Sequence, residues 1–277
     1  MGDMVERSAG ADGGRRTDGT PRALRRRRGA VLQRDVAPGV HLLQHASTNA
    51  YLLEDADGIT LVDTLFPRTR RHLDAALAAL GRGADDLRAV VLTHAHFDHL
   101  GMAAGLVADG VPLHLHRGDA HIAEHPYSYR RARTPLAFPP RYPAALPILA
   151  GMVAAGALGV RGVRETTPLE PGAVLDVPGR PRVVATPGHT DGHVALHLEA
   201  ADAVLSGDAL VTLDPYTAQV GPRLVAAAAT ADPDAAERSL DAIEATGARL
   251  VLPGHGDPWH GGAAAAAEAA RVAGVAW

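Results

Sequence analysis

The chain has 277 residues, 47% of them hydrophobic, and contains no cysteine. This length and apolar content suffice for one large layered domain, while the lack of cysteine excludes disulfides and thiolate metal ligands. The net charge of −4 conceals a basic N-terminus, because residues 1–30 contain eight arginines and four acidic residues and the rest of the chain is acidic overall. An acidic body argues against a nucleic-acid groove.

Neither a membrane-spanning segment nor a signal peptide is apparent. There is no run of about 18 apolar residues, and the N-terminus lacks the apolar stretch that export signals contain. We therefore expect a cytoplasmic protein without a membrane partner. Residues 1–30 are rich in Gly, Arg, Asp and Thr and predict a disordered basic tail, whereas residues 31–277 predict a single folded domain.

Short apolar runs and helical spacings alternate along the first half of the domain. Turn residues separate three β-like runs, and Pro67 and Gly81 bound a stretch with apolar residues at helical spacing. A buried strand then precedes a second helix, for which Asp98 is the expected acidic cap. The elements predicted here are strands at 39–44, 49–54 and 58–64, a helix at 67–81, a strand at 88–94, a helix at 98–110 and a strand at 111–116.

The second half begins with a segment of different composition. Residues 120–165 are rich in Pro and Ala and contain four of the ten aromatic residues of the chain, Tyr127, Tyr129, Phe138 and Tyr142. With a short helix at 144–157, this segment is either a lid over a site or a packing element such as a homodimer contact. The elements predicted after it are strands at 182–186, 193–198, 202–207 and 248–254, a helix at 232–247 capped by Asp232, and a helix at 262–274.

The stretch VVLTHAHFDHLG, residues 90–101, places three histidines and an aspartate within six positions after an apolar run. His94 and His96 are two residues apart, so an extended chain directs both imidazoles to one side. Asp98 and His99 follow where the strand gives way to a helix, and a turn there can direct them to an adjacent position. One segment can thus supply ligands to two metal ions.

Three further candidate ligands lie downstream, each after an apolar strand and each directly preceded by glycine. They are His189 in ATPGHTDGH, Asp208 in VLSGDAL and His255 in LVLPGHGDP. Glycine allows the backbone to approach closely, and loops at strand ends commonly carry functional sites. We therefore expect these residues to complete the metal site begun by the first block.

Together, THAHFDH, PGHTDGH, GD and GHGD resemble the metallo-β-lactamase superfamily of metallohydrolases, over residues 40–260. The resemblance implies an α/β fold, an αββα sandwich of two mixed β-sheets flanked by helices, formed by residues 31–277 as one catalytic domain. It also implies a dinuclear site. The implied ligands are His94, His96 and His189 for one ion, Asp98, His99 and His255 for the other, and Asp208 as the bridge. Asp63, at the end of ITLVD, would hydrogen bond the metal loop.

The ligand types and the resemblance together indicate a chemistry. Nitrogen and oxygen ligands without sulfur favour zinc, with iron or manganese as the alternatives. Two such ions can hold a bridging hydroxide that attacks a carbonyl carbon, and Asp98 could pass a proton to the leaving group. Of the other histidines, His193 is expected to orient the site, while His114 and His116 are expected to be structural.

Comparison with known branches of the superfamily narrows the range of expected substrates. True metallo-β-lactamases generally lack the bridging aspartate, so Asp208 argues against β-lactam cleavage as the main reaction. Hydroxyacylglutathione hydrolases carry a basic helical C-terminal domain, whereas only 22 residues follow His255 here, which argues against a glutathione thioester. Acylhomoserine lactonases have a tyrosine shortly after the bridging aspartate, but the first tyrosine after Asp208 is Tyr216. The tRNA-processing nucleases use a basic arm for which the acidic body offers no equivalent.

The sequence therefore predicts a dinuclear hydrolase that cleaves an ester, lactone or thioester of a small, partly apolar substrate. Two alternatives stay open, a mononuclear iron oxidoreductase resembling the persulfide dioxygenases and a metal-dependent phosphodiesterase.

Overall fold

The computed structural model describes residues 5–7 and 29–277, and these residues form three β-sheets. The first sheet has the strand order β1 (Val5–Arg7), β2 (Val31–Ala37), β3 (Val40–His45), β4 (Thr48–Asp55), β5 (Gly58–Val62), β6 (Leu87–Val91), β7 (Leu113–Leu115) and β8 (Thr167–Pro168). The second has the order β14 (Leu250–Pro253), β11 (Ala203–Gly207), β10 (Val194–Leu198) and β9 (Arg182–Ala185). The short strands β12 (Val211–Leu213) and β13 (Val220–Arg223) form the third.

Eight α-helices accompany these sheets in the described part of the chain. They are α1 (Arg70–Ala79), α2 (Phe97–Leu100), α3 (Ala103–Ala108), α4 (Ala120–Glu124), α5 (Phe138–Arg141), α6 (Leu146–Ala155), α7 (Pro233–Glu244) and α8 (Ala263–Ala273). The cap predicted for α7 is confirmed, because the Asp232 side chain accepts a hydrogen bond from the Ala235 amide at 3.0 Å.

The strands of the two larger sheets direct alternate side chains to opposite faces. On β4, Tyr51 packs toward the second sheet and its neighbour Leu52 packs on the outer side. On β14, Leu252 packs between the sheets and Val251 packs against helices. Because alternate side chains point to opposite faces and both sets include apolar residues, each sheet is buried on both faces.

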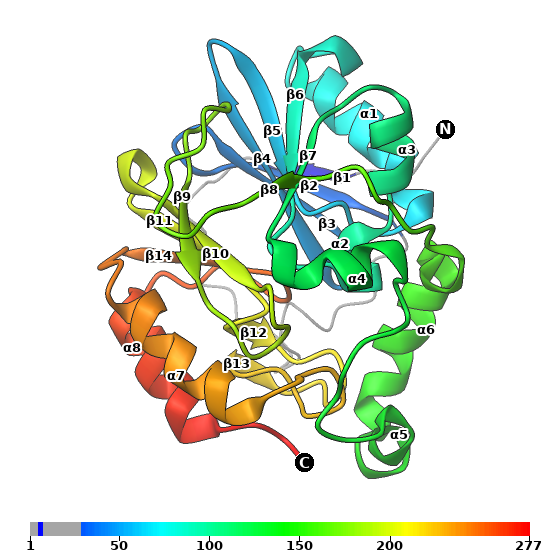
Figure 1. Cartoon of the computed structure of the whole chain (residues 1–277), viewed down its shortest axis with the longest axis vertical. Helices are drawn as coiled ribbons and strands as arrows, with labels where there is room; N and C mark the ends of the chain where they lie inside the picture. The colour runs from blue at the N-terminus through cyan, green and yellow to red at the C-terminus, as the bar shows by residue number, and fades with distance from the viewer. Residues whose placement is uncertain (1–4, 8–28) are drawn as a thin grey trace.

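Three apolar clusters fill the spaces between four layers. One cluster lies between the two sheets, a second packs α1, α3 and α6 against the outer face of the first sheet, and a third packs α7 and α8 against the second sheet. Figure 1 shows α7 and α8 outside the four-stranded sheet, with α1 and α3 beside the eight-stranded one. The predicted αββα sandwich is confirmed.

Two predicted boundaries near the histidine-rich stretch are wrong. The strand ends at Val91 rather than at His94, so His94 and His96 lie in the loop that follows β6. The helix predicted over 98–110 is two short helices, and His96 rather than Asp98 occupies the N-cap position of the first. The break lies at Gly101, whose amide donates to the Leu65 carbonyl at 2.9 Å, a contact from outside the helix.

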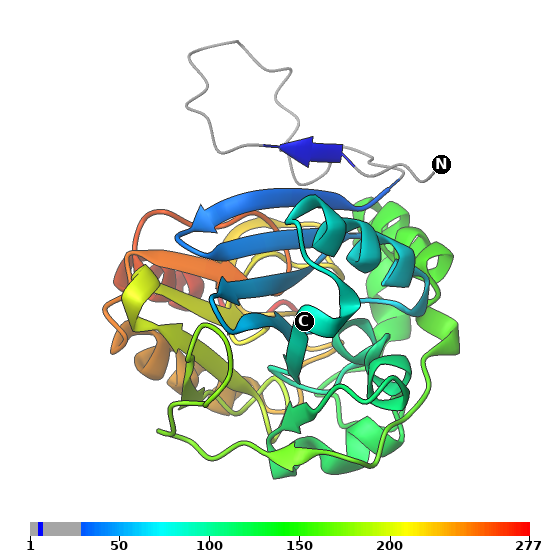
Figure 2. The same cartoon turned by 90° about the horizontal axis from the view of Figure 1, so that it is seen from above.

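The N-terminal region contributes one strand to the described structure. The residues predicted to form a disordered basic tail lie mostly outside the described residues, but Val5–Arg7 form β1, which pairs in parallel with β2 at the edge of the first sheet (Figure 2). Within the described part of the chain, no helix combines the length and the apolar character needed to cross a bilayer.

Candidate metal centre

The seven predicted ligands come from four loops that converge on one end of the sandwich. The loop and helix after β6 carry His94, His96, Asp98 and His99; the loops after β9, β11 and β14 carry His189, Asp208 and His255, respectively. Each of the seven is at most 7% exposed, and Asp98 is the most exposed of them. Residues separated by up to 161 positions in the sequence therefore form one buried polar cluster.

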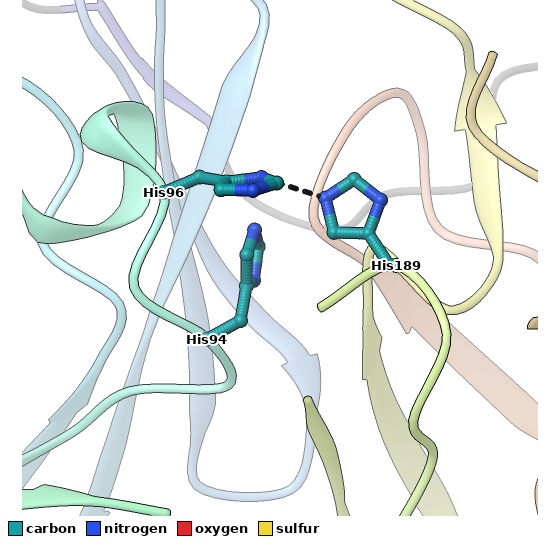
Figure 3. A group of neighbouring side chains, drawn as sticks. All are labelled: His94, His96 and His189. Carbon is teal, nitrogen blue, oxygen red and sulfur yellow. Dashed lines mark hydrogen bonds between the residues drawn. The ribbon is translucent and has the colours of Figure 1, made fainter. Parts of the chain in front are cut away.

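One triad of this cluster consists only of histidines. Figure 3 shows His94 and His96 reaching from the loop after β6 toward His189 on the opposite loop. One candidate ligand atom from each of the three lies within 4.8 Å of the others. The His96 Nδ1 and His189 Nε2 atoms are only 2.9 Å apart, so both point into the same small space.

A second triad lies beside the first. It consists of Asp98, His99 and His255, whose candidate ligand atoms also lie within 4.8 Å of one another. The His255 Nε2 atom is 3.3 Å from Asp98 Oδ2. One carboxylate and two imidazoles in this arrangement are an ordinary donor set for a divalent ion.

Asp208 lies between the two triads. Its Oδ2 atom is 3.5 Å from His189 Nε2 in the first triad and 3.3 Å from His255 Nε2 in the second. Its Oδ1 atom is 3.5 Å from His99 Nε2. A single carboxylate thus faces ligands of both groups, which is the position required of a bridge.

The cluster contains buried polar atoms that find no hydrogen-bond partner among the described residues. Such atoms are costly in a protein interior unless a ligand satisfies them. Five of them belong to predicted metal ligands: the Nε2 atoms of His94, His96, His99 and His255, and Oδ1 of Asp208. These unpaired polar atoms belong to side chains whose candidate ligand atoms lie close together, and bound metal ions would satisfy them. The residues therefore fit metal ions.

Hydrogen bonds behind the cluster hold several imidazoles in place. Asp63, the early aspartate predicted for this role, lies 2.8 Å from His99 Nδ1 and accepts hydrogen bonds from the Thr93 amide and hydroxyl. His255 Nδ1 lies 2.8 Å from the Ser47 carbonyl oxygen. Occupying Nδ1 in this way leaves Nε2 of each ring for a metal ion.

His193 also takes the orienting position expected for it. Its Nδ1 atom is 2.8 Å from the Thr186 hydroxyl, and its Nε2 atom accepts a hydrogen bond from the Asp208 amide at 3.0 Å. His193 therefore holds the backbone of Asp208 and belongs to none of the groups of potential metal ligands in the described part of the chain.

The environment keeps the all-histidine triad neutral. Burial lowers the pKa of His96 to about 4, and it lowers the pKa of His94 well below its ordinary value, with further contributions from neighbouring histidines. A neutral imidazole has the free lone pair that metal coordination requires.

In the second triad, neighbouring carboxylates favour the charged form of a histidine. Burial alone would lower the pKa of His99, but three surrounding carboxylates outweigh it and raise that pKa to about 9. These carboxylates belong to Asp208, Asp63 and Asp98. Burial would likewise raise the pKa of Asp208, yet His255 and His99 hold it well below its usual range. The carboxylates therefore remain ionised and attract positive charge, which divalent ions also supply.

Glycines before the downstream ligands allow the close approach that their positions suggested. A Cβ atom on Gly254 would lie 2.1 Å from Asp208 Oδ1 and 2.9 Å from His99 Cε1. A Cβ atom on Gly207, whose φ is +50°, would lie 2.8 Å from the Thr93 Cβ atom. Neither position has room for a side chain beside the cluster.

Asp119 is a supporting residue that the sequence does not identify. It is fully buried, and its carboxylate accepts hydrogen bonds from the Ala95 amide at 2.9 Å, the Thr190 hydroxyl at 2.8 Å and the Gly192 amide at 2.8 Å. Asp119 thereby joins the loop between His94 and His96 to the loop that carries His189. The sequence shows only that Asp119 ends an RGD turn, and a turn aspartate is usually exposed.

The segment 120–165 reaches the cluster through Tyr129. The Tyr129 ring lies 4.0 Å, centroid to centroid, from the His96 ring. A hollow of about 380 Å³ adjoins this contact; its lining includes Tyr129, Ile122 and Tyr127 from the segment and Thr190 from the loop of His189. None of the seven predicted ligands lines the hollow itself, so it lies beside the cluster rather than around it.

His114 and His116 lie apart from the cluster, as predicted. His114 is half-buried on β7, and burial lowers its pKa. The His116 Nδ1 atom accepts a hydrogen bond from the Gly118 amide at 3.2 Å, which caps a turn. Neither belongs to a group of potential metal ligands in the described part of the chain.

Comparison with known proteins gives the family. The family model described as "Metallo-beta-lactamase superfamily" matches residues 45–255. The chain is 28% identical over 243 residues to "Probable metallo-hydrolase YflN" of Bacillus subtilis (strain 168), a match that covers 82% of this chain and 87% of that protein.

Two solved structures are similar in both fold and sequence. The metallo-beta-lactamase family protein TTHA1429 from Thermus thermophilus has a TM-score of 0.60 and 30% identity, covering 83% of this chain and 77% of that one. TTHA1623, in a di-iron-bound form, has a TM-score of 0.52 and 29% identity, covering 77% of this chain and 89% of that one. With its convergent His and Asp ligands and a family match over most of its length, the chain belongs to the metallo-beta-lactamase superfamily of metallo-hydrolases.

Proposed function

We propose that this protein is a dinuclear metal-dependent hydrolase that cleaves an ester, lactone or thioester of a small, partly apolar substrate. The observation that carries the proposal is the position of Asp208, whose carboxylate faces ligands of two adjacent triads. His94, His96 and His189 would hold one divalent ion, and Asp98, His99 and His255 would hold the other. The di-iron form of TTHA1623 supports two ions, and the donor set favours zinc, with iron or manganese as alternatives.

Two divalent ions in this position would supply a nucleophilic hydroxide at neutral pH and Lewis-acid polarisation of a carbonyl oxygen. The chain itself provides the rest. Asp98, the most exposed of the ligands, is the residue we assign to proton transfer toward the leaving group. Asp63 and His193 keep His99 and Asp208 oriented through the hydrogen bonds described above.

The hollow beside Tyr129 is the proposed site for the remainder of the substrate. Its lining combines apolar surface from four residues with polar or charged side chains from five others. The apolar residues are Ile122, Tyr127, Tyr129 and Ala231, and the polar or charged ones are His121, Ser128, Arg130, Thr190 and Asp191. Mostly apolar linings with a few polar groups are typical of small-molecule sites. This composition supports a substrate with an apolar acyl or ring portion, and it is consistent with our proposal that the segment 120–165 is a lid.

A substrate panel on protein of measured metal content tests the proposal. The panel contains aryl esters, lactones, thioesters and bis(p-nitrophenyl) phosphate. We expect carboxyl-ester, lactone or thioester hydrolysis with two ions per chain. The Asp208→Ala variant should hold fewer ions and lose activity by at least about 100-fold, because it removes the shared ligand.

The control variant is Asp109→Ala, which removes a surface carboxylate that pairs with Arg70 and should leave activity unchanged. Exclusive cleavage of the phosphodiester would replace this proposal with a phosphodiesterase. A single iron per chain with oxygen uptake would replace it with an oxidoreductase.

A further inference from the structure

Residues 129–133 cross the rim of the metal centre and are anchored at both ends. At one end, the Tyr129 ring lies on the His96 ring at 4.0 Å. At the other, the Ala132 amide donates to the Thr230 carbonyl at 2.8 Å and the Arg133 amide donates to the Ala227 carbonyl at 2.9 Å. The Thr230 hydroxyl in turn lies 3.4 Å from His189 Nδ1. The backbone between these anchors is therefore held next to the first triad.

Arg131 lies between the two anchors. Its guanidinium carbon is 3.9 Å from the centroid of the Tyr129 ring, so the same ring contacts both Arg131 and His96. Stacking on an aromatic face leaves the edge of a guanidinium, with its N–H groups, available to another ligand. The side chain is exposed, and no ion pair joins it to a carboxylate of the described residues.

The neighbouring Arg130 also lines the hollow, but its charge is already paired. Its guanidinium pairs with Asp191 at 3.3 Å on the surface, and both partners are exposed. Arg131, one residue further, has no such partner among the described residues and instead lies against the ring that covers His96. The two arginines therefore differ in that Arg130 is paired with a carboxylate, whereas the N–H groups of Arg131 are not in an ion pair with any described residue.

The charge of the segment differs from that of the rest of the domain. Residues 120–165 contain six arginines and only two acidic residues, although residues 31–277 as a whole have more acidic than basic side chains. A local excess of positive charge on an otherwise acidic protein attracts anions. Arginine in particular binds carboxylates and phosphates through two parallel hydrogen bonds.

We propose that Arg131 binds an anionic group of the substrate, a carboxylate or a phosphate, and so selects esters, lactones or thioesters that carry such a group away from the scissile bond. This inference rests on the proposed hydrolase function and narrows its substrate class. Tyr129 contributes by holding the guanidinium at the rim, and the hollow beside it receives the apolar part.

Matched pairs of p-nitrophenyl esters test this selection. The succinyl, glutaryl and adipoyl half-esters are compared with the butanoyl, pentanoyl and hexanoyl esters, which have a methyl group where the acid has a carboxylate. The 3-phosphonopropanoyl ester distinguishes phosphate from carboxylate recognition. We expect the wild-type enzyme to prefer an anionic member of at least one pair by roughly tenfold or more in kcat/KM.

The variants assign this preference to Arg131. Arg131→Ala should abolish it through a higher KM for the anionic ester while leaving the neutral esters unchanged, and Arg131→Lys should retain part of it. The control Arg164→Ala, which removes an exposed arginine of the same segment that pairs with Glu124, should retain all of it. Equal kcat/KM values for anionic and neutral esters in the wild type, or a preference that survives Arg131→Ala, would overturn the inference while leaving the hydrolase proposal intact.

A binding measurement separates the two proposals if no ester is cleaved. Calorimetry with succinate and butyrate on the metal-loaded protein should show tighter binding of succinate to the wild type, and equal binding of the two to Arg131→Ala. That result without any turnover would sustain the anion site and refute hydrolysis. Equal binding of both acids to the wild type would refute the anion site.

Discussion

Gly254 illustrates how a single position without a side chain shapes the metal centre. The Cβ atom of an alanine there would lie 2.1 Å from Asp208 Oδ1, far inside van der Waals contact. We expect Gly254→Ala to displace the bridging carboxylate, reduce bound metal below two ions per chain and remove most activity. Metal analysis of the purified variant provides the measurement.

The matched control for this substitution is Gly105→Ala. Gly105 lies inside α3, and a Cβ atom added there meets nothing within 4 Å. Alanine at such a position should be neutral or stabilise the fold by about 0.5–1 kcal/mol. If Gly254→Ala kept a full complement of metal, the tight packing around Asp208 would not govern the site.

Asp119 is the residue that we expect to couple the two loops of the all-histidine triad. Asp119→Ala leaves two buried amides and one hydroxyl without their acceptor, which should destabilise the protein by about 2–4 kcal/mol. Metal affinity should also fall, because the loop of His94 and His96 would no longer be joined to that of His189. Urea unfolding and metal titration measure the two effects separately, and unaltered metal affinity would limit Asp119 to a role in stability.

At the level of elements, the contact between the end of β3 and the start of α1 includes a partly buried histidine, His45, that makes stability depend on pH. Burial, aided by His72 and Arg71, lowers the pKa of His45 to about 4 from an ordinary value of 6.5. As the pH falls, His45 of the unfolded chain takes up a proton near pH 6.5, whereas His45 of the folded protein takes one up only near pH 4. The contribution of His45 to stability is complete above pH 6.5 and is lost as the pH falls toward 4.

The variant His45→Asn tests this sign. Asparagine retains a polar partner for the Thr69 hydroxyl, which lies 2.8 Å from His45 Nδ1, but it does not titrate. Relative to this variant, the wild type should lose about 1–2 kcal/mol of unfolding free energy between pH 7 and pH 4.5, a value reduced for the partial exposure of the ring. Urea unfolding at both pH values gives the difference, with the exposed His260→Asn as the control. A constant difference would be inconsistent with a neutral buried His45.

Elements whose boundaries depend on distant contacts are those that the sequence predicts least well. The helix predicted over 98–110 has continuous helical character, but it is interrupted where Gly101 packs against Leu65. The sequence does not predict the strands β12 and β13, because the glycine and proline of β13 disfavour a strand and β12 pairs only with that strand. In contrast, α7 has a local cap and a long amphipathic repeat, and its start is predicted to within one residue.

At the scale of the whole molecule, some residues of the candidate site could be predicted from local sequence features and others could not. The seven ligand candidates could be predicted because their types and spacings are local features of four short motifs. Asp119 and Tyr129 could not, because their roles depend on contacts with residues up to 73 positions away in the sequence. The layered fold was predictable from the resemblance, and the period-two burial of the strands shows why that fold suits this sequence.

The buried cluster also links metal binding to the stability of the whole domain. In the proposed centre, metal ions would bind the folded arrangement of the seven candidate ligands and not the extended chain, so removing them would lower the free energy of unfolding. We expect dialysis against a chelator to lower the Tm by several degrees or more, and added zinc to restore it. Calorimetric scans before and after reconstitution provide the test. An unchanged Tm would mean that the ions do not bind the folded cluster.

The positions of the bound ions test the two-metal centre most directly. Anomalous scattering from crystals of the zinc-reconstituted protein, recorded on both sides of the zinc absorption edge, locates each ion without reference to the chain. We expect two peaks per chain, one among His94, His96 and His189 and the other among Asp98, His99 and His255, with Asp208 in contact with both. One peak, or peaks away from these side chains, would contradict a shared dinuclear site.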